Sequence, residues 1–122
     1  MALALDLAHG TQTASIGTEH TLSTQTGSGI FTIVVNLKNL ADGDRVVLRA
    51  YAKVLTGDSQ AWLVYEGTYD HKQGDGSAVG SSALGEVLAA SPPVVSPFSV
   101  SFTLKQTVGT GRAFDWRVDQ LN

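Results

Sequence analysis

The chain has 122 residues, a formal net charge of -3 and no cysteine. This length suits one domain that buries enough surface to fold without disulfides or a structural metal. The acidic balance and the scattered basic residues argue against a general nucleic-acid surface, and the absence of cysteine excludes disulfides and thiolate metal sites.

The sequence has no segment typical of a membrane protein or of a secreted precursor. No apolar run approaches the roughly 18 residues that a membrane-spanning helix needs. The start of the chain, MALALDLAHG, has no basic residue ahead of its apolar ones, so we expect no secretory signal. We therefore expect no membrane partner.

The first ten residues predict a short N-terminal arm. Leu3, Leu5 and Leu7 alternate with Ala4 and Asp6, which is the period of a β-strand. Two placements fit this arm equally well. Folded back, it is an edge strand of its own domain; extended, it adds a strand to a sheet of a neighbouring copy.

Four further strands are predicted before residue 72. A modest strand is expected at residues 18–24, and a strong one at 30–38, where IFTIVVNLK alternates strictly. NLADGD then turns the chain, since Asp and Gly tolerate the backbone angles of tight turns. Residues 45–55 and 61–71 form a hairpin if TGDS is its loop.

The register of this central hairpin follows from its side chains. Opposite charges meet on one face, small residues oppose large ones on the other, and a slip of one residue destroys both patterns. The predicted pairs are Arg45 with Asp70, Arg49 with Glu66 and Lys53 with Trp62 on the polar face, and Val46 with Tyr69, Leu48 with Gly67, Ala50 with Tyr65 and Ala52 with Leu63 on the apolar face.

The last third contains a loop and a second predicted hairpin. Residues 72–97 are rich in Gly, Ser, Ala and Pro and predict a long surface loop, with an edge strand or one helical turn near residues 84–90. The segment FTLKQTVGTGRAFDWRVD then alternates on both sides of TVGTG. The hairpin predicted from it pairs Leu104 with Phe114, Phe102 with Trp116 and Val100 with Val118.

Together these elements predict an all-β fold. About seven or eight strands without a convincing helix favour a single antiparallel β-sandwich domain over residues 1–122. A small β-barrel is the alternative.

The histidines do not form a predicted site. None of His9, His20 and His71 has a second histidine or a carboxylate at a spacing that fixes a metal on one face. Asp70 and His71 point to opposite faces if their strand persists. We interpret these histidines as exposed positions near strand ends, because a general base requires geometry before it requires a suitable pKa.

The glycine-rich stretches predict turns. DGD at residues 42–44 and GDGS at 74–77 lack the D-x-D-x-D-G pattern and the distant Glu of a calcium loop. GTGR at 109–112 lacks the G-K-S/T ending of a phosphate loop and joins two strands. No G-x-S-x-G occurs. The sequence therefore predicts no cofactor, no metal site and no enzyme.

An exposed aromatic surface is the remaining candidate for function. In the predicted register Tyr51, Trp62 and Val64 share the polar face of the central hairpin with Arg49 and Lys53. Exposed aromatic residues beside arginine are typical of interface cores, and they also form platforms on which sugars stack. The alternative is that this face packs under the long loop.

One resemblance adds to these observations. The runs LADGDRVVLRAYAKVL, AWLVYEGTYD and SPPVVSPFSVSFTLKQTVGTGRAFDWRVDQL resemble small all-β structural proteins of tailed bacteriophages. The resemblance spans roughly residues 39–121 and is most specific at 104–116. It implies a virion protein, above all a head decoration (cement) protein, made in the host cytoplasm and carried on the capsid surface.

The partners implied by this resemblance are the major capsid protein and neighbouring copies of the chain, as a homo-oligomer in the assembly, with no direct nucleic-acid contact. A protein that binds only the assembled shell stabilises it by mass action. A tail or fibre component, or a carbohydrate-binding module that uses Trp62 and Tyr51, is the alternative. A hydrolase with an unrecognised site is a more distant one.

Overall fold

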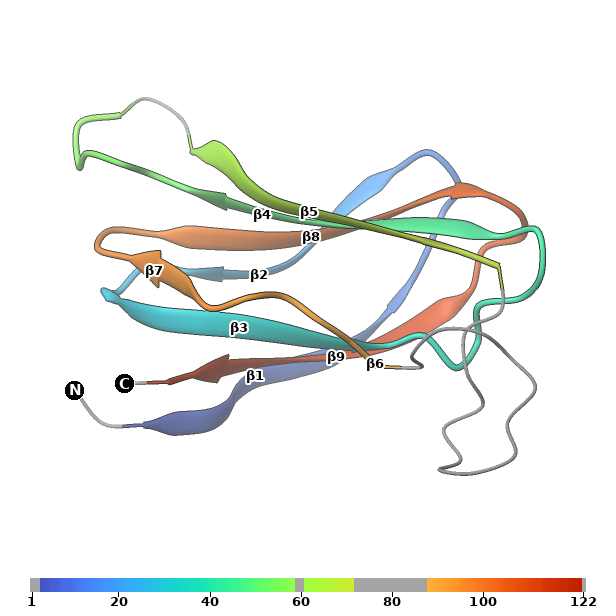
Figure 1. The fold of residues 1–122 in the computed structure, drawn as a ribbon, viewed down its shortest axis with the longest axis horizontal. Helices are drawn as coiled ribbons and strands as arrows, with labels where there is room; N and C mark the ends of the chain where they lie inside the picture. Colours follow the sequence, from blue (N-terminus) through green and yellow to red (C-terminus); the bar gives the residue numbers. More distant parts are fainter. Residues whose placement is uncertain (1–2, 59–60, 72–87, 122) are drawn as a thin grey trace.

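The computed structural model describes residues 3–58, 61–71 and 88–121, and in these ranges it contains strands and no helix. Two antiparallel sheets pack face to face, which confirms the predicted β-sandwich, and they do not close into a barrel (Figure 1). The strands are β1 (Ala4–Thr13), β2 (Glu19–Gln25), β3 (Gly29–Asn36), β4 (Arg45–Ala52), β5 (Trp62–Asp70), β6 (Leu88–Ala90), β7 (Val94–Ser96), β8 (Val100–Val108) and β9 (Ala113–Gln120).

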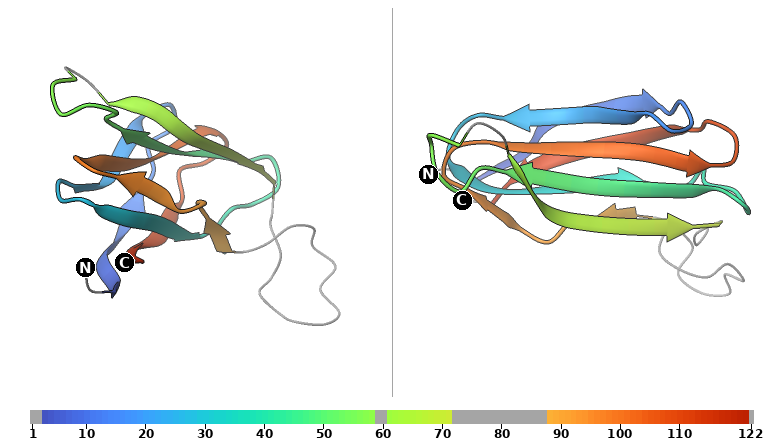
Figure 2. Two further views of the ribbon diagram at one scale, coloured as in Figure 1. Left: turned by 60° about the vertical axis from the view of Figure 1, so that its left-hand side comes forward. Right: turned by 90° about the horizontal axis from the view of Figure 1, so that it is seen from above.

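The two sheets have different sizes and edges. The five-stranded sheet runs in the order β1-β9-β3-β6, and β7 pairs with β3 beside β6. The four-stranded sheet runs in the order β2-β8-β4-β5 and is seen from its outer side in the right-hand view of Figure 2. Strands β1 and β5 therefore lie at edges of different sheets.

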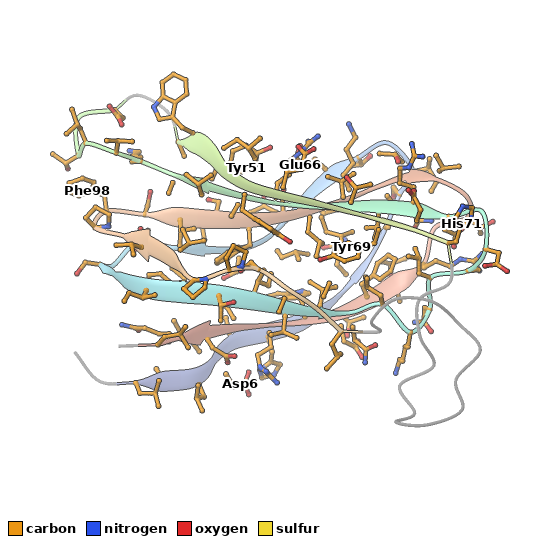
Figure 3. The ribbon with its side chains drawn as sticks, viewed as in Figure 1. Asp6, Tyr51, Glu66, Tyr69, His71 and Phe98 are labelled. Carbon is orange, nitrogen blue, oxygen red and sulfur yellow. The ribbon has the colours of Figure 1, made fainter. Side chains whose placement is uncertain are left out.

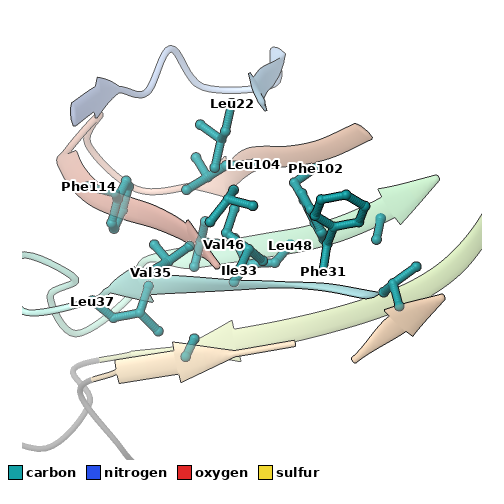
Figure 4. Close-up of a cluster of buried hydrophobic side chains, with 14 of the residues drawn as sticks. Leu22, Phe31, Ile33, Val35, Leu37, Val46, Leu48, Phe102, Leu104 and Phe114 are labelled. Carbon is teal, nitrogen blue, oxygen red and sulfur yellow. The ribbon is translucent and has the colours of Figure 1, made fainter. Parts of the chain in front are cut away.

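The hydrophobic core lies between the sheets. Alternation places every second side chain of a strand inward, so Phe31, Ile33 and Val35 of β3 are at most 2% exposed while the residues between them are half-buried. Phe102 and Phe114 have no exposed surface, and burial of each ring contributes about 3 kcal/mol. Figure 4 shows these side chains with Leu22, Leu37, Val46, Leu48 and Leu104.

The predicted C-terminal hairpin is wrong, although its apolar layer is buried. Strand β8 pairs with β2 and β4, whereas β9 pairs with β1 and β3, so the chain crosses from one sheet to the other between them. Leu104 lies opposite Leu48 and not opposite Phe114. A hairpin and a crossover bury the same alternate residues, so alternation alone does not distinguish them.

Buried polar groups hold this crossover in place. The Gln106 side chain, which is fully buried, donates to the carbonyl oxygens of Thr110 (2.7 Å) and Val108 (3.2 Å) and accepts from the Arg112 backbone N–H (3.0 Å). Arg112 Nε in turn donates to Asp44 Oδ2 at 2.8 Å. We call this end of the sandwich, with residues 37–44 and 109–112, the crossover end.

The central hairpin confirms most of its predicted register. Strands β4 and β5 pair Arg45 with Asp70, Val46 with Tyr69, Leu48 with Gly67, Arg49 with Glu66 and Ala50 with Tyr65. Beyond them, a β-bulge shifts the register, so Tyr51 pairs with Leu63 and Ala52 with Trp62.

The predicted pairs of Lys53 with Trp62 and of Ala52 with Leu63 are therefore wrong. Val64 is the extra residue on β5. Trp62, Leu63 and Val64 are all large and apolar, so no break in the alternation marks the bulge in the sequence.

The N-terminal arm takes the folded-back placement. Residues 8–13 of β1 pair with β9 in continuous register, from Ala8 with Val118 to Thr13 with Ala113. The register is irregular between Ala4 and Ala8, where Asp6 has a φ of 55°. The arm is therefore the edge strand of its own domain in this structure.

The described end of the predicted loop adds two short strands to β3. The expected edge strand near residues 84–90 is confirmed for Leu88–Ala90, whereas residues 72–87 lie outside the described part. Strand β7 was not expected. Ser91 joins the two strands to β3, since its Oγ accepts the Ile33 backbone N–H at 3.1 Å.

We expect Gly109→Ala to destabilise the crossover by more than about 2 kcal/mol, because a Cβ there would overlap the Asp44 carboxylate and Gly109 has a φ of 101°. Gly17→Ala is the matched control, since Gly17 has a φ of 83° and open space around it, and should cost about 1 kcal/mol. Urea unfolding measures both. Equal losses would show that only the backbone angle matters at Gly109.

Candidate functional site

The described residues contain no cluster typical of a metal site, since no group of three or more His, Cys, Asp or Glu side chains is placed to hold an ion. The histidine rings make local contacts. His9 Nδ1 lies 3.0 Å from Asp6 Oδ1, and His20 and His71 accept backbone N–H groups of Ser15 and Gly43. No helix in the described part is long and apolar enough to cross a membrane.

A polar network crosses the outer face of the four-stranded sheet. Glu19 of β2 accepts hydrogen bonds from Tyr51 and Thr103, both at 2.7 Å, and from Arg49 at 2.9 Å. Arg49 also donates to Glu66 on β5 at 2.9 Å. The network therefore links all four strands of the sheet, and Figure 3 labels Tyr51 and Glu66 in it.

These contacts shift the pKa values of the network. Burial alone raises the pKa of Glu19, but hydrogen bonds from Thr103 and Tyr51 and the charge of Arg49 together hold it below its ordinary value of 4.5. The hydrogen bond to Glu19 raises the pKa of Tyr51, and the hydrogen bond to Glu66 raises the pKa of Arg49. The charged forms of Glu19 and Arg49 thus stabilise each other.

The polar network contains only two of the five residues of the predicted aromatic face. Arg49 and Tyr51 meet at Glu19. Lys53 lies beyond the end of β4, and Trp62 and Val64 lie at the bulged start of β5, where they are 53% and 51% exposed. The predicted aromatic face is therefore divided into a polar network and an apolar hairpin tip.

Sequence reasoning missed Glu19 and Thr103. Both come from strands far from β4 in the sequence, so their positions depend on the pairing of β8 with β2 and β4. It also missed Leu63, Val54 and Leu55. The sequence signal for these residues was the run of three large apolar residues at 62–64. A strand with one face in solvent does not need apolar side chains on both faces, so this run indicates exposed apolar residues.

The exposed apolar side chains gather toward one end of the sandwich. The start of β1 and the end of β9 lie at the same end as the end of β4 and the start of β5 in both Figure 1 and Figure 2. We call this the terminal end. Most of the exposed large apolar side chains lie in this half: Leu3, Leu5, Leu7, Val54, Leu55, Trp62, Leu63, Val64, Val95 and Leu121.

The apolar residues of the hairpin tip are held by an ordered turn. Asp58 Oδ2 accepts the backbone N–H groups of Val54 (3.1 Å) and Leu55 (3.0 Å). These two side chains are 67% and 65% exposed. A carboxylate that fixes the backbone therefore presents two aliphatic side chains to solvent, which is unusual for a turn without a partner.

Two shallow hollows lie on the five-stranded sheet. One of about 250 Å³ lies beside the arm and is lined by Leu5, Asp6, Arg117 and Asp119. The other, of about 190 Å³, is lined by Val34, Asn36, Leu88, Asp115, Trp116 and Arg117. Asp119 in the first hollow is bonded to Asp6 N–H and Arg117, so its oxygens are already engaged.

Comparison with protein-family models, with curated proteins and with solved structures finds no match to this chain.

Because the pKa of Glu19 is lower in the folded chain than in the unfolded one, its carboxylate stabilises the fold above its ordinary pKa of 4.5, and this stabilisation disappears as the pH falls through the folded value. We expect Glu19→Gln to lower the free energy of unfolding by about 1 kcal/mol at pH 7 and by less in acid.

Urea unfolding between about pH 7 and pH 3 measures this difference. Asp58→Asn also removes one negative charge but keeps an amide oxygen that can accept the Val54 and Leu55 N–H groups, so it controls for the change in net charge. An equal loss from Glu19→Gln at every pH would contradict the role of the ionised carboxylate.

Proposed function

We propose that this chain is a non-enzymatic structural protein of a tailed phage particle, a capsid decoration protein that attaches to the assembled head through its terminal end. The single observation that carries the attachment is the concentration of exposed apolar side chains at that end. The phage assignment rests on the resemblance of the segment around residues 104–116 to virion proteins.

The electrostatics of the molecule support the choice of surface. On the outer face of the four-stranded sheet, the charges of Glu19, Arg49 and Glu66 are paired with each other. At the crossover end, Asp44 is paired with Arg112. Desolvating such paired charges in an interface is costly, whereas the aliphatic side chains of the terminal end are stabilised when they leave water.

The mechanism is linkage between binding and assembly. A protein that binds the assembled lattice and not its free subunits stabilises the lattice by its binding free energy, summed over many copies. Weak individual contacts with the capsid are sufficient for stable attachment when neighbouring copies also contact each other. The partners in this proposal are the major capsid protein and further copies of this chain, on the surface of the virion.

A direct test is binding of the purified protein to heads that lack it. We expect Val54→Ser with Leu55→Ser to weaken binding at least tenfold, because about 2 kcal/mol of apolar burial is lost. Ile16→Ser with Val108→Ser is the matched control, since these residues are 44% and 46% exposed outside the terminal end. Cosedimentation measures both. A control that weakens binding as strongly would contradict the assignment of the surface.

A carbohydrate-binding module, at a tail tip or fibre, is the second candidate, and the exposed indole of Trp62 is the observation that favours it. The other tryptophan, Trp116, is half-buried and lies against Gly10. Glycan stacking would therefore quench Trp62 fluorescence saturably, and Trp62→Phe would abolish the response. The decoration proposal predicts a flat titration with host-surface glycans, and a saturable one would favour the sugar-binding function.

A further inference from the structure

The two sheets have four outer edges, and two of these are protected against pairing with another chain. Sheet edges present unpaired backbone groups, which proteins protect with polar side chains, prolines or short strands. The edge strand β2, EHTLSTQ, is mostly polar and bulged. The edge formed by β6 and β7 consists of three-residue strands separated by Pro92 and Pro93.

The other two edges, β1 and β5, are also irregular, between Ala4 and Ala8 and at Val64, but both strands are long and expose large apolar side chains. Neither strand contains Lys, Arg or Pro. Among the described residues β1 pairs only with β9, and β5 from Trp62 to Thr68 pairs only with β4. Both strands expose large apolar side chains in their first half, which lies toward the terminal end.

The backbone of β1 is only partly used by its own sheet at this point. Ala4 pairs with Gln120 and the next pair is Ala8 with Val118, so residues 5–7 have no register partner in β9. Leu3 and Leu5 are 61% and 64% exposed, and Ala8 is the first residue of β1 that packs against the core. Residues 3–7 therefore contribute little apolar burial to their own domain.

We propose that β1 of one copy pairs in parallel with β5 of a second copy of this chain, so that apolar edges of two sandwiches join into one sheet. One register places Leu7 beside Val64 of the second copy and Leu5, which lies beyond the irregularity at Asp6, near Trp62. The same register places His9 beside Glu66. Apolar residues thus meet apolar residues, and an imidazole meets a carboxylate.

The parallel direction follows from the fold together with the proposed function. Strands β1 and β5 both begin at the terminal end and run toward the crossover end (Figure 1). Parallel pairing therefore keeps the terminal ends of neighbouring copies on the same side. This orientation rests on the proposed function, in which all terminal ends meet one capsid surface.

The contact is heterologous, because different edges of the two copies meet. Such contacts generate rings or open chains according to the rotation between neighbours. The contact joins one strand edge of each copy, so we expect weak association, in the range of about 10–100 μM, that cooperates with attachment to a surface.

The test uses two variants that each block one edge. Leu5→Lys with Leu7→Lys blocks β1, and Trp62→Lys with Val64→Lys blocks β5. We expect the wild-type chain to increase in mass with concentration and each variant to remain monomeric. An equimolar mixture of the two should form a dimer and nothing larger, because one intact β1 edge meets one intact β5 edge. Sedimentation velocity up to about 1 mM resolves these species.

The control variant is Thr21→Lys with Thr26→Lys, which adds the same two positive charges on and beside β2. We expect this variant to assemble like the wild type. A β1-blocked variant that assembles alone, a mixture that stays monomeric, or a wild-type chain that stays monomeric would each overturn the proposed pairing. Thermal unfolding verifies that each variant folds.

Cosedimentation with heads separates this pairing from the proposed function. A monomeric wild-type chain that still binds heads overturns the pairing alone, and assembly without binding to heads overturns the proposed function alone.

Discussion

The crossing of the chain from β8 to β9 is the constraint on which the rest of the sandwich depends. Gln106 and the pair of Asp44 and Arg112 satisfy the polar groups of this buried crossing. Because of it, β8 becomes central in one sheet and β9 central in the other. Phe102 and Phe114 then contribute to one core from opposite sheets. At the turn, the carbonyl oxygens of Val108, Thr110 and Arg112 accept hydrogen bonds.

This arrangement also separates the two ends of the molecule by chemistry. The crossover end uses its charges internally, as in the hydrogen bond from Arg112 to Asp44. At the terminal end Asp58 fixes the backbone of the hairpin turn, and the edge strands β1 and β5 expose Leu5, Trp62 and their neighbours. An end that is ordered yet apolar favours a contact surface, because folding alone gives no reason to expose these side chains.

The sequence allowed much of the fold to be predicted, because alternation identifies strands and their buried faces. It placed the five pairs from Arg45–Asp70 to Ala50–Tyr65 correctly through charge and size complementarity. The prediction failed at the β8–β9 crossover, because a hairpin and a crossover bury the same residues. It also failed at the β-bulge, because the extra residue, Val64, is apolar like its neighbours and does not interrupt the alternation. Of the candidate site it found Arg49 and Tyr51, but Glu19 depends on pairing between distant segments.

The central claim is that the terminal end is the contact surface, and hydrogen–deuterium exchange tests it most directly. Backbone exchange would be compared between the free protein and the protein bound to phage heads. We predict slower exchange on binding at residues 3–7 and 53–64, with little change at residues 14–18 and 107–112. Protection confined to the crossover end, or to the outer face around Glu19 and Arg49, would contradict the claim.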